Sequence, residues 1–220
     1  MIPKILHYIL IDPGKFTALN EKCLASWKAN LPDYEHRFWT SKDFEHLDYV
    51  KAAKNSGANP KHIPVYISIY ARLWVLNEVG GFYVDNDAEV VRPPDTNHSM
   101  FFGFQRDDQE AGCINDGAMA SVKNHPFLIE RMKEIEQAGF SMLPAELGPH
   151  FLTDQLVRRG LVPNYEEQTL RDDIHIYPKE VLYPWRWDEK PDPSRITERT
   201  VSIHHWEGTW VDKSSHESTC

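Results

Sequence analysis

Two aspartates separated by one residue have the type and spacing to bind a cation together. Asp85 and Asp87 follow directly after the apolar run Phe82–Val84. Residues two apart in an extended strand point to the same side, so both carboxylates can meet one ligand. Paired carboxylates without cysteine favour a hard ion such as Mg²⁺ or Mn²⁺, which keeps open positions for phosphate oxygens. The pattern therefore indicates a site for a metal ion and a phosphorylated ligand.

The spacing by itself is a weak signal, and its context strengthens it. With 16 aspartates in 220 residues, about one such pair is expected by chance. An acidic turn after a strand is the alternative interpretation. Here, however, a long helix that carries Arg72 precedes the carboxylates through Gly80–Gly81 and an apolar strand. Because ligands of open α/β sheets bind at strand ends, this context favours a site.

The elements that must position these carboxylates follow a strand–helix–strand pattern. Apolar residues 5–11 predict a buried strand, residues 16–31 have helical spacing, and residues 34–39 predict a second strand. Pro64 is placed to open a long helix through Glu78. Such alternation is typical of an α/β fold. Further expected elements are a short acidic helix capped by Ser41, irregular chain over residues 49–62, strands at residues 100–104, 113–121, 174–177 and 201–203, and helices at residues 125–138 and 153–159.

Five short motifs follow one another along nearly the whole chain: Ile2–Tyr8, Ser68–Leu76, Gly80–Asp87, Gly148–Thr153 and His204–Trp210. In this order they resemble glycosyltransferase family 32, the DXD sugar transferases related to yeast α-mannosyltransferases and to the glucosylating domains of large clostridial toxins. The resemblance implies an α/β fold of the GT-A type, a single domain with a central mixed, mostly parallel sheet flanked by helices. We expect this domain to span residues 1–213 and residues 214–220 to form a frayed tail.

The resemblance also implies a nucleotide-sugar donor, a UDP- or GDP-linked hexose, and a Mn²⁺ or Mg²⁺ ion. Asp87 is expected to bind the ion directly, and Asp85 to hold the donor ribose and the water shell of the ion. His205, five residues before Trp210, resembles the position that completes the ligand set. Trp210 and the neighbouring Thr209 resemble the pair that closes over the diphosphate.

Other residues are expected beside the donor sugar. By the same resemblance, Tyr83 lies next to the diphosphate or sugar, and Arg72 contacts the donor. Asp116 follows Asn115 in a stretch of small residues, where it either faces the sugar ring or belongs to a turn. We expect Asn115 to contribute to donor binding. The expected catalytic residues are Asp85, Asp87, Arg72 and Asp116.

Two positions depart from the family pattern, and both concern donor recognition. The family usually has an aspartate three residues before the arginine, where it binds hydroxyls of the donor sugar; this chain has Ile69. The first strand of the family commonly ends in a tryptophan that can stack on the nucleobase; this chain has Leu10. The metal and diphosphate positions remain, so we expect the chemistry to be retained and leave the donor identity open.

The acceptor side is indicated by aromatic residues late in the chain. Trp185 and Trp187 are as consistent with an acceptor groove as with a core, because indole rings pack well on sugar faces. Asp154 is expected to cap a helix or otherwise to be a site residue. Adjacent residues of a strand point to opposite faces, so at most one of His204 and His205 can serve the same metal. We expect His204 to be the structural one.

Composition excludes some classes of partner. The chain carries 33 acidic and 24 basic side chains, a net charge of −9. Nucleic-acid binding depends on clustered Lys and Arg, so this balance argues against a nucleic-acid partner. Three cysteines without metal-ligand spacing indicate a reduced, cytoplasmic location. No apolar run reaches the ~18 residues of a membrane span, so we expect no transmembrane segment.

Together these features predict a metal-dependent, retaining glycosyltransferase that moves a hexose to a saccharide, a lipid-linked glycan or a polysaccharide precursor. No protein nucleophile stands out, which favours attack by the acceptor on the face from which the diphosphate leaves. One alternative is a degenerate nucleotide-sugar- or sugar-binding module that lost activity with Ile69 and Leu10. Another is a metal-dependent phosphohydrolase, although such sites generally need two ions about 4 Å apart and more carboxylates.

Overall fold

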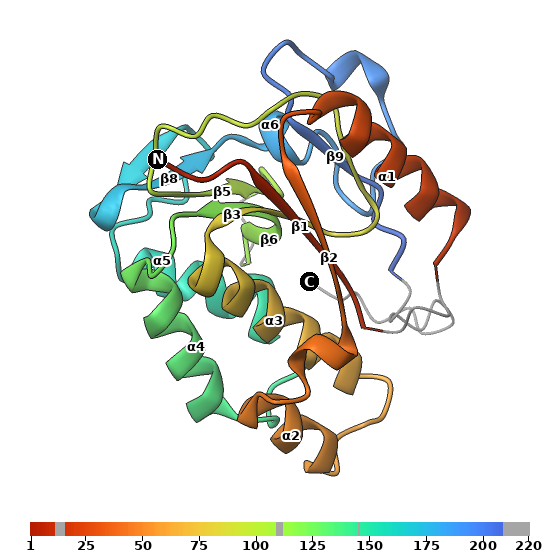
Figure 1. The fold of residues 1–220 in the computed structure, drawn as a ribbon. Coiled ribbons are helices and arrows are strands. Elements are labelled where there is room, and N and C mark those ends of the chain that lie inside the picture. The colour runs from red at the N-terminus through yellow and green to blue at the C-terminus, as the bar shows by residue number, and fades with distance from the viewer. Residues whose placement is uncertain (12–15, 109–111, 145, 209–220) are drawn as a thin grey trace.

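A computed structural model describes residues 1–11, 16–108, 112–144 and 146–208 (Figure 1). Within these residues a seven-stranded sheet forms the centre, in the order β2-β1-β3-β6-β5-β8-β7, and β4 pairs with β9 in a second, two-stranded sheet. The strands are β1 (Ile5–Leu10), β2 (Glu35–Thr40), β3 (Gly81–Val84), β4 (Ala88–Val90), β5 (Met100–Phe104), β6 (Ile114–Ser121), β7 (Gln168–Leu170), β8 (Ile174–Tyr177) and β9 (Ser202–His204). The tail expected at residues 214–220 lies outside the described part of the chain.

The central sheet is mixed, as expected, but parallel pairs are not in the majority. Strand β1 is parallel to β2 and β3, and β5 is parallel to β8. Strand β6 is antiparallel to both β3 and β5, and β7 is antiparallel to β8. Three of these six neighbouring pairs are therefore parallel. The short connection from β5 returns the chain directly as β6, which only an antiparallel partner allows.

Helices cover both faces of the central sheet (Figure 1). The helices are α1 (Ala18–Asn30), α2 (Asp48–Asn55), α3 (Ile63–Val79), α4 (Pro126–Ala138), α5 (Phe151–Val157) and α6 (Lys179–Leu182), with 3-10 turns at Ser41–Phe44, Arg171–Asp173 and Pro193–Arg195 and a π turn at Glu146–His150. Helices α2 to α5 pack on one face around Tyr83 and Phe102, whereas α1, α6 and the β4–β9 pair pack on the other face around Phe82 and Val84. The alternation of Phe82, Tyr83 and Val84 between two cores explains why β3 is apolar throughout.

The expected elements agree with the structure except around residues 41–62. Strands β5 and β8 have the predicted bounds, and α3 ends at Val79 before Gly80, whose φ is +74°. The prediction of irregular chain over residues 49–62 is wrong, because α2 occupies Asp48–Asn55 and buries Tyr49, Val50 and Ala53. Their spacing of one and three residues forms one apolar helix face, which is hard to recognise in an eight-residue helix. The expected acidic helix is a single 3-10 turn, Ser41–Phe44, capped by Thr40 rather than by Ser41.

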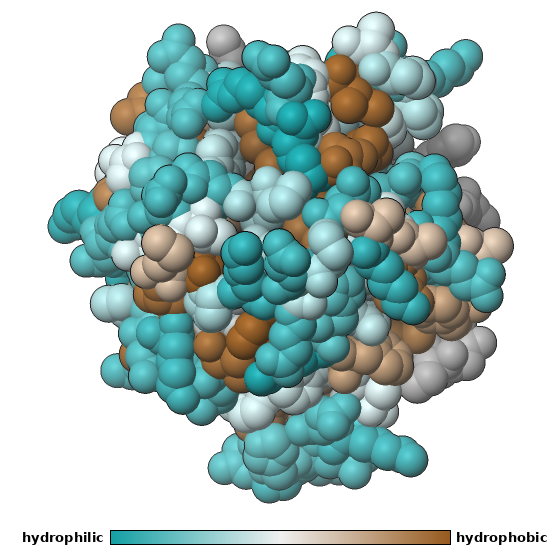
Figure 2. Space-filling view, turned by 45° about the horizontal axis from the view of Figure 1, so that its top comes forward, coloured by the Kyte–Doolittle hydropathy of each residue, from teal (hydrophilic) through white to brown (hydrophobic). Residues whose placement is uncertain are grey.

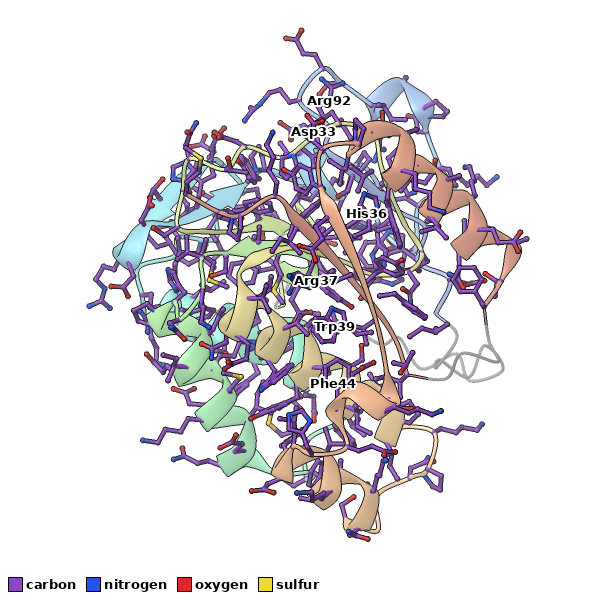
Figure 3. The ribbon with its side chains drawn as sticks, in the orientation of Figure 1. Asp33, His36, Arg37, Trp39, Phe44 and Arg92 are labelled. Atoms are coloured by element: carbon purple, nitrogen blue, oxygen red, sulfur yellow. The ribbon has the colours of Figure 1, made fainter. Side chains whose placement is uncertain are left out.

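A buried histidine joins β1 to β2 and to the end of α3. His7 Nε2 donates to the Gly80 carbonyl (2.8 Å), and Nδ1 accepts from Trp39 Nε1 (3.0 Å). An indole N–H can only donate, so this pair of bonds requires the neutral imidazole. Figure 3 shows Trp39 on β2 beside Phe44, on the side of β2 that faces α3, where it also meets Trp74 edge to face. A Cβ on Gly81 would lie 2.9 Å from His7 Nε2, so glycine is required at this crossing.

Acid is expected to destabilise the fold through His7. Burial lowers the pKa of this imidazole from 6.5 to about 4. Between these two values the unfolded chain binds a proton that the folded chain does not, so stability falls by about 3 kcal/mol as the pH drops from 7 to 4. Urea unfolding of the wild type and of His7→Gln at both pH values measures this contribution. The variant should show a smaller loss, and an equal loss in both proteins would contradict the assignment.

The surface seen in Figure 2 is mostly hydrophilic, with apolar patches separated by polar side chains. In the part of the chain that the structure describes, none of the helices is both long enough and apolar enough to cross a lipid bilayer.

Candidate active site

The two aspartates lie at the edge of the sheet where its main strands end. Asp85 directly follows β3, which runs parallel to β1 and, through β6, in the same direction as β5. The last residues of β1, β3, β5 and β8 therefore lie along one edge. Strand β6 runs the opposite way and begins at this edge, with Asn115 and Asp116 among its first residues. Open α/β sheets bind ligands at this edge.

Asp85 is held by three neighbouring groups. The Tyr83 hydroxyl donates to Asp85 Oδ1 at 2.5 Å, and Arg72 Nη2 lies 3.2 Å from the same oxygen. The Asp85 backbone N–H donates to the Gly117 carbonyl at 2.7 Å. Burial raises the pKa of Asp85, although the nearby charges of Arg72 and His204 oppose it. Arg72 also covers the Tyr83 ring, with its guanidinium carbon 4.9 Å from the ring centre.

Asp87 is held by the C-terminal segment. His204 Nε2 lies 3.0 Å from Asp87 Oδ1, and the Glu207 backbone N–H donates to Oδ2 at 2.8 Å. Trp206 directs this N–H toward the carboxylate by adopting a left-handed backbone (φ +55°), a conformation that non-glycine residues adopt mainly where their surroundings hold them. Burial alone would raise the pKa of Asp87, but His204 and the Glu207 N–H lower it below its usual range.

Asp85, Asp87 and His204 form a group that fits a divalent cation. Their ligand atoms lie within 4.8 Å of one another. The side chains are 23%, 15% and 9% exposed, so the group is open to solvent on one side. Two carboxylates and one imidazole are a donor set that suits Mn²⁺ or Mg²⁺. His204 Nδ1 is buried and has no hydrogen-bond partner among the described residues, and Nε2 is the ring nitrogen that lies beside Asp87.

The two adjacent histidines differ in which carboxylate they face. His205 Nε2 lies 2.6 Å from Glu89 Oε1, on the opposite side of the chain from the aspartates. His204, expected to be structural, is the one that faces them. The alternation of side chains at the end of β9 allows only one of the two to point to the carboxylates. Which one it is depends on the pairing register of β9 with β4, Ala88 opposite His204.

Asp116 is buried and is held between two arginines. Its Oδ1 accepts from Arg72 Nη1 (3.1 Å) and its Oδ2 from Arg131 Nη2 (3.2 Å). Both oxygens of Asp116 thus accept a hydrogen bond from an arginine, and the side chain is 5% exposed. Sequence reasoning missed Arg131, although a signal was present: Arg131 is in line with Phe127, Leu128 and Ile135 on the apolar face of α4.

Asn115 and Gly117 lie at the start of β6, next to Asp85. Asn115 Nδ2 donates to Gln105 Oε1 (2.7 Å), and its Oδ1 accepts from the Gly117 N–H (2.6 Å). The Asn115 side chain therefore braces the start of β6 in this structure. A Cβ at position 117 would lie 2.7 Å from Asp85 Oδ2, so only glycine leaves space for this carboxylate. Leu10, which ends β1 where the family commonly has a tryptophan, is close by, because the carbonyl of the adjacent Ile9 accepts from Asn86 Nδ2 (2.6 Å).

The sequence and the fold of this chain are similar to those of known glycosyltransferases. Residues 18–102 match the family described as "Glycosyltransferase sugar-binding region containing DXD motif". The matched residues include Arg72, Asp85 and Asp87. Over 146 residues, 64% of the chain, the sequence is also 27% identical to inositol phosphoceramide mannosyltransferase 3 of Schizosaccharomyces pombe. The aligned part covers 39% of that protein, so the match spans about two fifths of the relative's length.

The fold of this chain is shared with a solved structure. The PaToxG glycosyltransferase superposes with a TM-score of 0.54 at 19% identity, over 75% of this chain and 72% of that one. A glycosyltransferase involved in glycosylation of the major capsid of PBCV-1 superposes with a TM-score of 0.47 at 13% identity, over 92% and 93% of the two chains. Since the second score is below 0.5, the fold assignment depends on the first. The expected GT-A-type fold and the resemblance to DXD sugar transferases are confirmed.

The residues expected on the acceptor side differ in exposure. Trp185 is 5% exposed, and its carbonyl accepts from Trp206 Nε1 (2.9 Å), so this ring belongs to the core rather than to a groove. Trp187 is 37% exposed, and the guanidinium of Arg106 lies 5.3 Å from its ring centre. Asp154 is exposed within α5 and is not its cap, which is His150. The expected diphosphate pair, Thr209 and Trp210, lies outside the described residues.

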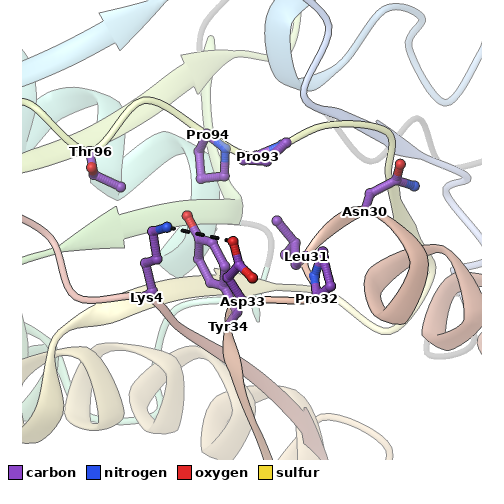
Figure 4. Close-up of a pocket in the computed structure, with 9 residues that line it drawn as sticks. All are labelled: Lys4, Asn30, Leu31, Pro32, Asp33, Tyr34, Pro93, Pro94 and Thr96. Carbon is purple, nitrogen blue, oxygen red and sulfur yellow. Dashed lines mark ion pairs between the residues drawn. The ribbon is translucent and has the colours of Figure 1, made fainter.

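Two pockets lie at different ends of the strands. One of about 440 Å³ lies beyond the ends of β5 and β8, on the side of the carboxylate group; it is lined by Asp107, Tyr165, Lys179, Glu180, Pro184, Glu189, Arg195 and Thr197. The other, of about 110 Å³, includes Lys4 and Tyr34, which precede β1 and β2 (Figure 4). The smaller pocket is thus at the opposite edge of the sheet from Asp85, and we assign it no part in the site.

Proposed function

We propose that this chain is a metal-dependent, retaining glycosyltransferase that moves a hexose from a nucleotide-sugar donor to a saccharide or glycan-precursor acceptor. One observation carries the proposal: Asp85, Asp87 and His204 converge within 4.8 Å at the ligand-binding edge of a DXD-type region. Arg72 lies beside this group at 3.2 Å from Asp85 and adds a positive charge on the side facing α3.

Asp85, Asp87 and His204 are the residues that would hold a Mn²⁺ or Mg²⁺ ion. Such an ion, when bound, would neutralise charge that develops on the leaving diphosphate. The protein adds fixed charges of its own: the Arg72 guanidinium is 3.1 Å from Asp116 Oδ1 as well as near Asp85, so its position is set before a donor arrives. Preorganised donors of this kind stabilise developing charge without reorganisation.

The retaining course is proposed from the resemblance to retaining DXD sugar transferases, and Asp116 bears only on whether a protein nucleophile takes part. This carboxylate was a candidate to face the sugar, yet both of its oxygens accept hydrogen bonds from arginines. It is therefore not placed to attack the anomeric carbon. A reaction in which the acceptor hydroxyl attacks on the face from which the diphosphate departs needs no protein nucleophile, and we propose this course.

We place the acceptor at the ends of β5 and β8. The pocket of about 440 Å³ lies there and is lined by carboxylates, cations and a tyrosine, which suits a polyhydroxylated ligand. Trp187 is partly exposed. It lies close to this pocket, because the backbone N–H of the adjacent Arg186 donates to Glu189 of the pocket wall (2.8 Å). The mannosyl donor and the ceramide-linked acceptor named for the fission-yeast relative are one donor–acceptor pair to test.

Thermal unfolding with a panel of nucleotides tests the donor site. UDP, GDP, UDP-glucose and GDP-mannose are each added with Mn²⁺ or with EDTA. A ligand at a hundred times its Kd adds about 2.7 kcal/mol of stability, which is about 5–10 °C for a chain of this size. We expect one nucleobase to raise the Tm only when Mn²⁺ is present. An equal rise in EDTA would contradict metal dependence, and no rise with any nucleotide would favour a degenerate module.

Transfer itself is tested with the nucleotide sugar that gives this shift and with simple saccharides as acceptors. The anomeric configuration of the product, read by proton NMR, is expected to match that of the donor. An inverted product would contradict the same-face reaction and leave the donor site intact.

A further inference from the structure

We propose that Arg131 is a positioning residue for the donor site, because through Asp116 it holds Arg72 in the orientation that reaches Asp85. The inference rests on the proposed function and adds to it a residue that contacts the site only through Asp116. Arg131 belongs to α4, and its side chain is fully buried.

A continuous chain of contacts links Arg131 to the metal group. Arg131 Nη2 donates to Asp116 Oδ2 (3.2 Å), and Arg72 Nη1 donates to Asp116 Oδ1 (3.1 Å). Arg72 Nη2 then lies 3.2 Å from Asp85 Oδ1. The side chains of Arg131, Asp116 and Arg72 are 0%, 5% and 9% exposed, so little water screens these charges. Two arginines and two aspartates alternate along this path, and their charges balance.

Arg131 itself is fixed by groups outside the site. Its Nη1 donates to Gln155 Oε1 of α5 (2.5 Å), and Nη2 also donates to the Leu147 carbonyl (3.4 Å). Gln155 Nε2 in turn donates to Glu134 Oε2 on α4 (2.9 Å). The guanidinium is therefore held by α5 and by the turn before it, and it presents one edge to Asp116.

The sharing of Asp116 explains how Arg131 acts on Arg72. A guanidinium and a carboxylate prefer a bidentate pair, with two parallel hydrogen bonds. If Arg131 did not occupy Oδ2, Arg72 could take both oxygens of Asp116 and turn away from Asp85. Because Arg131 occupies one oxygen, Arg72 Nη1 donates to the other oxygen and to the backbone carbonyl of Asp116 (both 3.1 Å). This leaves Nη2 near Asp85 Oδ1 (3.2 Å), where it also donates to Ser68 Oγ (3.3 Å). The orientation of Arg72 toward the donor site thus depends on a residue that touches neither metal ligand.

Three variants test this inference. Arg131→Met removes the charge and the hydrogen bonds at similar length, and Arg131→Lys keeps the charge but cannot bridge Gln155 and Asp116 as a planar fork does. Leu128→Ala is the matched control, because Leu128 is also fully buried on α4 and lies in the apolar core. For each protein, the Tm is measured with and without Mn²⁺ and the nucleotide that stabilises the wild type, and kcat and KM are measured below the Tm.

We expect all three variants to unfold at lower temperature than the wild type. Arg131→Met should also bind Mn²⁺–nucleotide about tenfold or more weakly and lose turnover per folded molecule, as is usual when a supporting partner of a site is removed. Arg131→Lys should recover part of the affinity and part of the turnover. Leu128→Ala should keep wild-type affinity and turnover per folded molecule, although it unfolds at lower temperature. Because Arg131→Lys retains a buried cation beside Asp116, it keeps the comparison possible if Arg131→Met does not fold.

The outcomes separate the two proposals. Wild-type affinity and turnover in a folded Arg131→Met, or in Arg131→Lys if only that variant folds, would overturn the inference while the donor site stands. An equal loss in Leu128→Ala would also overturn it, since loss of core packing alone would then account for the effect. If no nucleotide stabilises the wild type, the proposed function fails, and the inference fails with it.

Discussion

Replacing Asp87 with asparagine is expected to lower glycosyl transfer about a thousandfold, which corresponds to about 4 kcal/mol of transition-state stabilisation. Asparagine keeps the shape of the side chain and removes its negative charge. His204 and the Glu207 N–H contact Asp87 and lower the pKa of its carboxyl, so this side chain stays negatively charged. Loss of its charge removes the anion best placed to hold a dication.

The measurement pairs activity with Mn²⁺ binding followed by electron paramagnetic resonance. The control is Asp33→Asn, which changes an exposed aspartate at the other edge of the sheet, where Asp33 lies 4.0 Å from Lys4. We expect Asp87→Asn to fold, to lose Mn²⁺ binding and to lose transfer, and Asp33→Asn to match the wild type. Metal-dependent transfer that persists in Asp87→Asn would remove Asp87 from the mechanism.

The second large effect is expected at His204 and not at its neighbour. His204→Gln should weaken Mn²⁺ binding and transfer about a hundredfold, in the range found when groups in or next to a metal site are changed. His205→Gln should change either by less than about threefold, because the His205 side chain contacts Glu89 and neither aspartate. The reason is geometric: His204 Nε2 lies 3.0 Å from Asp87, whereas His205 Nε2 lies 2.6 Å from Glu89.

These two variants control for each other, because they are adjacent and make the same chemical change. The Kd for Mn²⁺ and kcat/KM are measured for both under one set of conditions. A larger loss in His205→Gln would restore the ligand that the sequence motif indicated and would contradict the orientation of β9. Equal losses would show that the segment, rather than one imidazole, supports the site.

Local patterns in the sequence were sufficient for the central part of the site. Tyr83, Asp85 and Asp87 lie within five residues, and an apolar strand that ends at Val84 determines where they emerge. Arg72 follows from a long helix that ends at a double glycine just before this strand. Periodicity and glycine placement act over short distances, so the order of the elements and the DXD edge could be predicted without coordinates.

Contacts between distant segments decided the rest. Asp87 and His204 are 117 residues apart, and Arg72 and Asp116 are 44 apart, so no local pattern specifies how they meet. The register of β4 with β9 selects His204 over His205, and the packing of α4 on α5 brings Arg131 to Asp116. The sequence by itself determined which two carboxylates lie together and where the strand presents them. Only the tertiary structure decided which histidine lies beside these carboxylates, because a one-residue shift in register reverses the face of every side chain on a strand. It also decided which second arginine reaches Asp116, because that contact depends on how α4 packs.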